Sequence, residues 1–176
     1  MLNISDLFVK SLSGYFSNVK CTRPKKHPDY RVATCDLVTS QYTIELTIVF
    51  NPRNLHEEAP IIFCDEPWIR RDINWHWFIP RKCPVCPNTH RLCWINPVEW
   101  RVAHGKKLKI RLAREGSLWL YNNTRDLLDK HWIGNELGIK LWRDDWPQWS
   151  HGEPEKNEFA DEIQIKGKPT NWEVLQ

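Results

Sequence analysis

Three cysteines and one histidine lie close together in the middle of the chain. Cys83 and Cys86 are separated by two residues, and His90 and Cys93 follow within the next few positions. Thiolate and imidazole groups are common ligands of zinc, and a thiolate is also the nucleophile of many acyl-transfer enzymes. The cluster therefore predicts either a metal site or a reactive cysteine.

The two interpretations differ in the state of Cys93. A zinc ion bound by Cys83, Cys86, His90 and Cys93 would occupy its thiolate at about 2.3 Å, whereas covalent catalysis requires that thiolate to be free. In a mixed arrangement, Cys83, Cys86 and a histidine hold zinc while Cys93 stays free. A disulfide with a neighbouring thiol, or an inert thiol buried beside Trp94, are further alternatives. The residues alone leave these alternatives open.

Length and composition fit one globular domain, residues 1–176. The chain is 41% hydrophobic and 12% aromatic, which is enough for a continuous core. Most of its eleven tryptophans fall between Trp75 and Trp149, where they would form an aromatic wall around the cysteine cluster. The net charge of +3 is too small to indicate a dedicated nucleic-acid surface.

The sequence also favours a particular compartment. No run approaches the roughly 20 apolar residues that span a bilayer, and the chain does not begin with a basic leader followed by an apolar core. We therefore expect a cytoplasmic protein without a membrane partner. In that compartment the six cysteines are more simply explained as reduced thiols, metal ligands or a nucleophile than as disulfides.

Periodic patterns predict the elements that would position the cluster. Apolar residues recur at helical spacing over Ile4–Val19, with Asn3 as the N-cap of an amphipathic helix. Residues 31–39 are predicted to form a strand, and strict alternation over 42–50 predicts a second, half-buried strand. A third strand begins near Pro60. The short connections favour an antiparallel meander.

The second half of the chain is less regular. No period holds over 66–97, which predicts a long ordered loop that carries the cluster. Residues 107–112 fit a short strand or an irregular helix with a basic face. Ser117 is expected to cap a helix that runs to about Trp132 and stops at Gly134. The tail from about residue 152 is expected to be mobile. Its acidic residues are Glu153, Glu155, Glu158, Asp161 and Glu162.

This order of elements, together with several short motifs, resembles the ubiquitin-conjugating-enzyme fold. The motifs are Pro60-Ile61-Ile62-Phe63 at the end of the sheet, His76, His90-Arg91-Leu92-Cys93, and Glu99-Trp100 beyond Pro97. More narrowly, the chain is similar to bacterial conjugating-enzyme-like proteins of cyclic-oligonucleotide antiphage defence (CBASS) operons. The resemblance covers about residues 1–135. It implies an α+β fold with an N-terminal helix, an antiparallel meander sheet, a long active-site loop and C-terminal helices.

The resemblance also implies an activity. The protein would be a ubiquitin-conjugating-like transferase that forms a thioester through Cys93 and needs no cofactor. The group that it carries would be the C-terminus of a partner cyclic-oligonucleotide synthase, a nucleotidyltransferase of the same operon. The alternative functions are a zinc-binding structural or interaction module without catalysis, and a scaffold that binds the same synthase. Whether the chain forms homo-oligomers is left open.

The residues near Cys93 suit such a reaction. Exchange of one thioester for another is nearly balanced in free energy, so Cys93 needs only a modest fraction of thiolate. Cationic neighbours that would lower its pKa are Arg81, Lys82, His90 and Arg91. Transfer to an amine builds negative charge on the carbonyl oxygen, where one preorganised donor is worth about 3 kcal/mol.

Three side chains are candidate donors to that oxygen. Asn88 is the nearest amide side chain in the sequence, and His76 and His90 are the alternatives. Backbone amides near Cys93 are further candidates. The sequence therefore names Cys93, His76, His90 and Asn88 as the catalytic residues.

Overall fold

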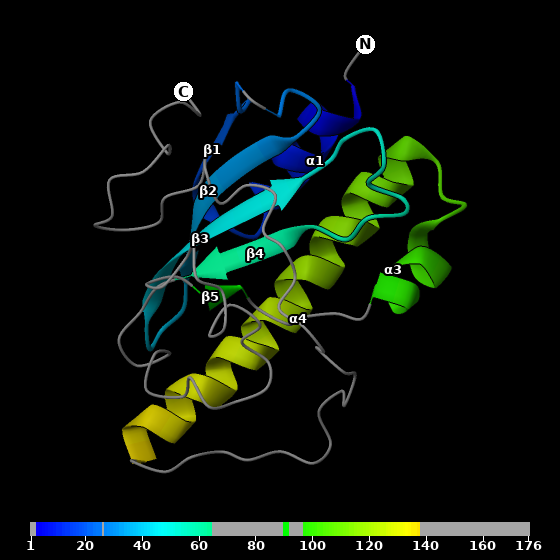
Figure 1. Cartoon of the computed structure of the whole chain (residues 1–176). Coiled ribbons are helices and arrows are strands. Elements are labelled where there is room, and N and C mark those ends of the chain that lie inside the picture. Colours follow the sequence, from blue (N-terminus) through cyan, green and yellow to red (C-terminus); the bar gives the residue numbers. More distant parts are fainter. Residues whose placement is uncertain (1–2, 26, 65–89, 92–96, 138–176) are drawn as a thin grey trace.

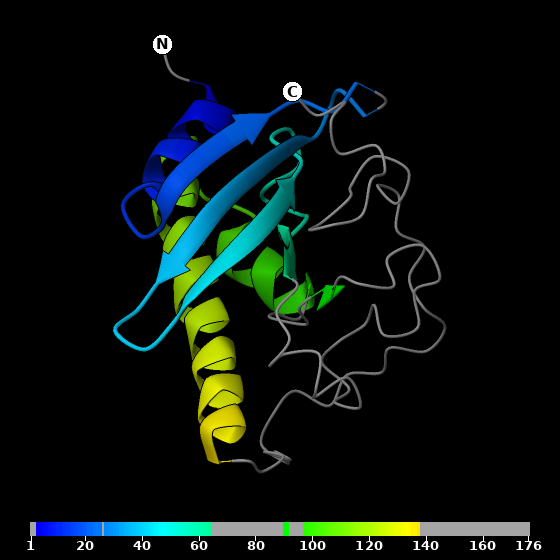
Figure 2. The same cartoon turned by 90° about the vertical axis from the view of Figure 1, so that its left-hand side faces the viewer.

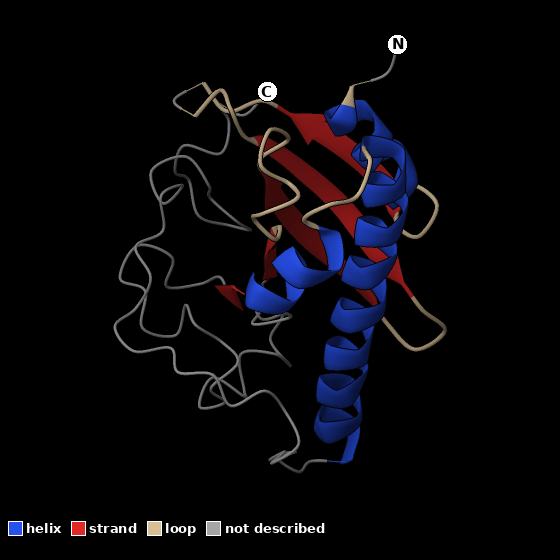
Figure 3. Ribbon diagram, turned by 90° about the vertical axis from the view of Figure 1, so that its right-hand side faces the viewer, coloured by secondary structure: helices blue, strands red, loops and turns tan. Residues whose placement is uncertain are grey.

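A computed structural model of the protein describes residues 3–25, 27–64, 90–91 and 97–137. Figure 1 shows that these residues form one antiparallel sheet and three helices. The helices lie on one face of the sheet: Figure 2 views the sheet with the helices behind it, and Figure 3 views the molecule from the helical side. The predicted mixed α+β architecture, with an N-terminal helix, an antiparallel sheet and C-terminal helices, is confirmed.

Helix α1, Ile4–Leu12, opens the domain as predicted. The side chain of Asn3 accepts a hydrogen bond from the Asp6 backbone amide at 2.9 Å, which is the expected N-cap. The prediction that the helix continues to Val19 is wrong. The chain turns after Leu12 and enters β1 at Ser17, and Phe16 before that strand is only 4% exposed.

The five strands follow one another in space as they do in the sequence. They are β1 (Ser17–Thr22), β2 (Arg31–Val38), β3 (Thr43–Phe50), β4 (Ile61–Cys64) and β5 (His90–Arg91), and each pairs antiparallel with the next. The predicted meander of β2, β3 and β4 is confirmed. Strands β1 and β5 were not predicted. Pairing with β2 explains β1, because it outweighs the helical periodicity of this segment.

The outer strand β1 is irregular. Its register against β2 shifts between Ser17 and Lys20, and Asn18 between them has a φ of 53°. The Asn18 amide donates a hydrogen bond to the Asp36 carboxylate of β2 at 2.8 Å. Asparagine tolerates this left-handed conformation better than most residues, so it suits the bulge.

Two helices follow β5. Helix α3 is Pro97–His104 and helix α4 is Lys109–Leu137. α3 was not predicted, and α4 is one continuous helix instead of a basic segment followed by a second helix. The prediction that Gly134 stops the helix is also wrong, because α4 continues past it to Leu137. A glycine inside a helix costs only about 1 kcal/mol, which packing of the rest of the helix can offset.

The predicted cap Ser117 lies inside α4. Its hydroxyl donates to the backbone carbonyl of Arg114 at 3.0 Å and contacts the hydroxyl of Ser11 in α1 at 2.5 Å. The prediction that Ser117 caps a helix is therefore wrong. Its hydroxyl, a group that favours helix starts, is instead hydrogen-bonded within α4 and to Ser11 of α1. Small residues here let α1 pack closely on α4.

The core lies between the sheet and the helices. It includes Phe8 and Leu12 of α1, Leu46 and Ile48 of β3, and Leu120 of α4, all 0% exposed. None of the helices in residues 3–64 and 97–137 is both long and apolar enough to cross a bilayer. The predicted long loop over 66–97, apart from β5 and the first residue of α3, and the predicted mobile tail lie outside the described residues.

Candidate functional site

Most of the predicted site residues lie outside the part of the chain that the structure describes. These are Cys93, His76 and Asn88 of the predicted catalytic set, and Cys83 and Cys86 of the alternative zinc set. His90 belongs to both sets, and its backbone is described. The predicted roles of all six residues therefore stay predictions.

His90 lies on the sheet. It pairs with Cys64, the last residue of β4, and Arg91 pairs with Phe63. The chain thus leaves the sheet at Cys64 and returns to the same strand end at His90. Cys93 follows this return by two residues, and α3 begins four residues later.

Helix α3 is anchored by Trp100, which is fully buried. Its indole nitrogen donates a hydrogen bond to the backbone carbonyl of Leu55 at 2.7 Å. Leu55 lies in the connection between β3 and β4 and is also 0% exposed. Trp100 therefore fixes helix α3, which follows the cysteine cluster, to the connection between β3 and β4. The motif Glu99-Trp100 alone does not reveal this role.

A glycine in α4 makes room for this tryptophan. A Cβ atom added to Gly116 would lie 3.0 Å from Cη2 of Trp100 and 3.8 Å from Cε2 of Phe8. The first distance is shorter than ordinary van der Waals contact. Gly116 thus allows α4 to approach both α3 and α1 (Figure 3).

His104 at the end of α3 is a buried histidine that the sequence did not single out. Its ring lies 4.3 Å from the ring of Trp100 and 4.9 Å from that of Trp119, between centroids, and it is 0% exposed. Burial and, secondarily, the nearby Lys107 lower its pKa to about 4. At neutral pH the imidazole is therefore uncharged.

The contact with Lys107 fixes the tautomer of His104. The Lys107 ammonium lies 3.2 Å from Nδ1 and can only donate, so Nδ1 accepts and Nε2 carries the proton. Among the described residues, Nε2 has no hydrogen-bond partner. Lys107 is also ion-paired with Glu115, whose pKa is held at about 2 by hydrogen bonds from Arg111 and Lys107. This geometry fits a packing role better than acid–base catalysis.

Three of the six cysteines are described, and none has the features of a nucleophile. Burial raises the pKa of Cys21 to about 11 and that of Cys35 to about 12. Cys64 is 0% exposed. A thiol becomes reactive when its pKa is lowered and an electrophile can reach it. The three strand cysteines are therefore structural.

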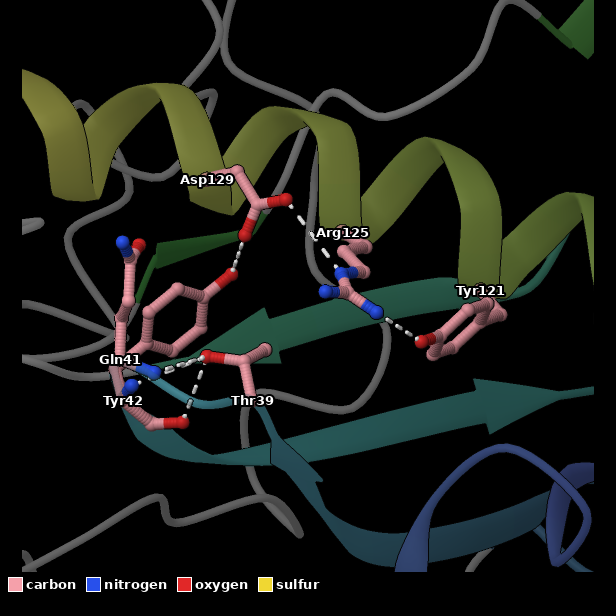
Figure 4. A network of polar contacts seen from close by, with 6 residues as sticks. All are labelled: Thr39, Gln41, Tyr42, Tyr121, Arg125 and Asp129. Carbon is pink, nitrogen blue, oxygen red and sulfur yellow. Dashed lines mark hydrogen bonds and ion pairs between the residues drawn. The ribbon is translucent and has the colours of Figure 1, made fainter.

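The structure also contains a polar network between the β2–β3 turn and α4 (Figure 4). The Tyr42 hydroxyl donates to the Asp129 carboxylate, which lies 3.5 Å from Nε of Arg125. Arg125 in turn donates to the Tyr121 hydroxyl at 2.6 Å. Burial, then the bond to Asp129, raise the pKa of Tyr42 far above its usual value, so its hydroxyl stays protonated. The network fastens the turn to the helix.

Within residues 3–64 and 97–137, no group of three or more His, Cys, Asp or Glu side chains is arranged to hold a metal ion. The alternative zinc set lies elsewhere, in the cysteine cluster. Comparison of the chain with protein-family models, curated proteins and solved structures found no match.

Proposed function

We propose that the protein is a ubiquitin-conjugating-like acyltransferase that forms a thioester through Cys93. The observation that carries the proposal is the return of the chain to β4 at His90 and Arg91. Two residues of chain span about 7 Å at most, so covalent connectivity alone keeps Cys93 near this corner of the sheet. Helix α3, tied to the sheet by Trp100, begins four residues later.

The order of elements supports the proposal. An N-terminal helix, an antiparallel meander, a long connection that returns to the sheet, and C-terminal helices on one face form the arrangement that the sequence resemblance leads us to expect. A rigid sheet with a long connection at its end is a common setting for catalytic residues.

The other thiols support it by elimination. Cys35 and Cys64 are buried in strands, Cys21 is half-buried in β1, and the pKa values of Cys21 and Cys35 are raised. The nucleophile must therefore come from Cys83, Cys86 and Cys93. Among these, Cys93 matches the motif His90-Arg91-Leu92-Cys93, in which the cationic Arg91 would favour its thiolate.

The proposed reaction has two steps. The Cys93 thiolate attacks the carbonyl carbon of an activated C-terminus, forming a C–S bond while the activating group leaves with its electron pair. An amine of the target then attacks the same carbon, the C–S bond breaks, and the amine loses a proton to a base. Asn88, His76 and His90 are the candidate donors to the carbonyl oxygen in the second step.

By the resemblance, the C-terminus that is transferred belongs to a cyclic-oligonucleotide synthase of the same bacterial antiphage operon. Its attachment to a target would prime synthesis of the signalling nucleotide. The protein would act as a cytoplasmic transferase in antiviral defence.

The proposal is tested by looking for a covalent adduct between this chain and the synthase. The chain is expressed together with the synthase of its operon, and the products are compared on gels with and without a thiol reductant and by intact mass. We expect an adduct that the reductant removes and that Cys93→Ala abolishes. Cys93→Ser should give an ester that resists the reductant, because an oxygen ester exchanges slowly with thiols.

Cys83→Ala and Cys86→Ala are the matched controls, and both should keep the adduct. Zinc content of the wild type and of Cys93→Ala is measured in parallel. One equivalent of zinc that is lost together with Cys93 would contradict the proposal and favour the zinc-binding module. An adduct that survives Cys93→Ala would also contradict it.

A further inference from the structure

A groove lies where α3 meets the start of α4. Its volume is about 540 Å³, and it is lined by residues from the end of α3, the connecting turn and the first turn of α4. The lining residues that carry the argument are Arg101, Lys106, Lys107 and Arg111, which are basic, and Val102 and Leu108, which are apolar.

Two of the apolar side chains that line this groove are highly exposed: Val102 and Leu108 are each 82% exposed. Val98 of α3 and Ile110 of α4 are 54% and 62% exposed. These four are most of the large apolar side chains that are exposed in the part of the chain that the structure describes. Clustered exposure of this kind marks a surface that another segment covers.

The groove also carries an excess of positive charge. Residues 97–115 contain Arg101, Lys106, Lys107, Lys109, Arg111 and Arg114, against the acids Glu99 and Glu115. Glu115 is already paired with Lys107 and with Arg111, the latter at 2.8 Å. The remaining cations, including Arg101 and Lys106 at the groove, are exposed to solvent. An acidic segment with a few apolar side chains would match this surface.

We propose that the acidic C-terminal segment of this same chain, residues 153–163, docks in the groove. The segment holds Glu153, Glu155, Glu158, Asp161 and Glu162, with Lys156 as its one basic residue. It also holds Phe159 and Ile163, four positions apart. The tail thus combines acidic residues with two large apolar ones, and the groove combines basic residues with apolar ones.

The tail is long enough to reach. The groove residue Arg111 and the end of α4 at Leu137 are separated by about 39 Å along the helix, at about 1.5 Å per residue. The linking residues 138–152 span about 50 Å when extended. Because the segment is tethered, its effective concentration at the groove is of the order of millimolar, so a weak contact suffices. The tail would compete with any acidic partner of the groove. This inference does not depend on the chemistry of Cys93.

Zero-length cross-linking of the full chain tests the contact. A carbodiimide joins a lysine amine to a carboxylate with loss of water only where the two groups touch. We expect links within one molecule between Lys106 or Lys109 and the acids of residues 153–162, found by peptide mass spectrometry. The yield should fall between about 0.1 and 1 M salt, because the Debye length shortens from about 10 to about 3 Å.

Three variants sharpen the test. Glu155→Lys with Glu158→Lys reverses charge in the tail and keeps other acids for the reaction, and Arg101→Glu reverses charge in the groove. Each should lower the yield severalfold. Lys20→Glu changes the net charge as Arg101→Glu does, but on the distant strand β1, and should leave the yield unchanged. Circular dichroism confirms that each variant is folded.

Other occupants of the groove would give different cross-links. In an equimolar mixture of isotopically light and heavy chains, docking within one molecule gives no links between a light and a heavy chain. If about half of the links join a light to a heavy chain, the segment docks between two copies and the inference is overturned. Links from Lys106 to the acids Asp65, Glu66 or Asp72, with none to the tail, would also overturn it, as would a yield that the charge reversals do not change.

Discussion

The indole of Trp100 and the carbonyl of Leu55 form a buried hydrogen bond of 2.7 Å across 45 residues of sequence. Both side chains are completely shielded from solvent. The bond joins α3 to the connection between β3 and β4. The position of α3 therefore depends on a residue that is distant in the sequence. Loss of this bond would remove the contact that holds α3, the helix that follows Cys93 in the sequence.

Trp100→Ala should therefore be strongly destabilising. Removal of a buried tryptophan leaves a cavity and deprives the Leu55 carbonyl of its donor, and such changes cost about 3–5 kcal/mol. The measurement is the free energy of unfolding from urea titration. Val102→Ala on the same helix is the control, because that side chain is 82% exposed and should change stability by no more than about 0.5 kcal/mol. Equal effects of the two changes would contradict the anchoring role.

Gly116→Ala should destabilise the protein although alanine favours helices. The helical preference alone would add about 1 kcal/mol. The new Cβ would lie 3.0 Å from Cη2 of Trp100, a ring that its hydrogen bond holds in place. In a Trp100→Phe background that atom is absent, so the same change should be neutral or stabilising. A double-mutant cycle by urea titration measures this coupling, and additive effects would show that the contact does not matter.

His104 should make stability depend on pH on the acid side. Its folded pKa, about 4, lies below the unfolded value of about 6.5, so the unfolded chain binds the proton first as the pH falls. The contribution is complete above pH 6.5 and is lost toward pH 4, with a slope of up to about 1.4 kcal/mol per pH unit.

The comparison for this prediction is between two histidine variants. His104→Gln should flatten the pH dependence of unfolding between pH 6.5 and 4. His56→Gln, at a side chain that is 40% exposed, should leave the slope as it is. If the wild type and His104→Gln have parallel pH profiles, the proposed burial of a neutral imidazole is wrong.

Tyr42→Phe should destabilise the protein by about 1–3 kcal/mol at neutral pH, because the Asp129 carboxylate loses a donor. The folded pKa of Tyr42 is raised, so its contribution is complete below the unfolded pKa of about 10 and declines as the pH rises beyond it. The difference between wild type and variant, measured by thermal unfolding, should therefore shrink at alkaline pH. A constant difference would count against the hydrogen bond.

The three strand cysteines should resist alkylation in the native protein. Cys21, Cys35 and Cys64 should each react far more slowly with iodoacetamide at pH 7.5 than in the denatured chain, because Cys35 and Cys64 are buried, Cys21 is half-buried, and the pKa values of Cys21 and Cys35 are raised. Peptide mass spectrometry at timed intervals gives the rates. Fast labelling of Cys35 would show that a strand cysteine is reactive. The assignment of the nucleophile to Cys83, Cys86 or Cys93 by elimination would then no longer hold.

Local signals predicted the elements that depend on neighbours in the sequence. The cap at Asn3 and the strand over 42–50 are confirmed as the start of α1 and as β3. The prediction that this strand is half-buried is wrong for its second half, because Thr47 and Val49 on the other face are buried as well. The short connections predicted the meander of β2, β3 and β4. Each of these features depends on residues that are close together in the sequence: the cap on Asn3 and Asp6, the strand on its own alternation, and the meander on the length of its connections.

The elements that depend on distant partners were missed. β5 has only two residues, so it has no period of its own and exists as a strand only because β4 accepts it. Val19 of β1 also fits the helical spacing that starts in α1, so the local pattern predicts helix where pairing with β2 gives a strand. The anchor at Trp100 joins residues too far apart for any local pattern to reveal. The predicted roles of Cys93, His76 and Asn88 concern residues outside the described part of the chain, and that part places only the backbone of His90, so all four roles stay predictions.

The irregularity at Asn18 has a consequence for self-association. Strand β1 borders the sheet, and a regular border strand offers an unbroken row of amide and carbonyl groups to a strand of another molecule. The register shift between Ser17 and Lys20 interrupts that row, and the lysine adds a charge that a second copy would repel. This margin is thereby protected against the edge-to-edge stacking that leads to aggregates.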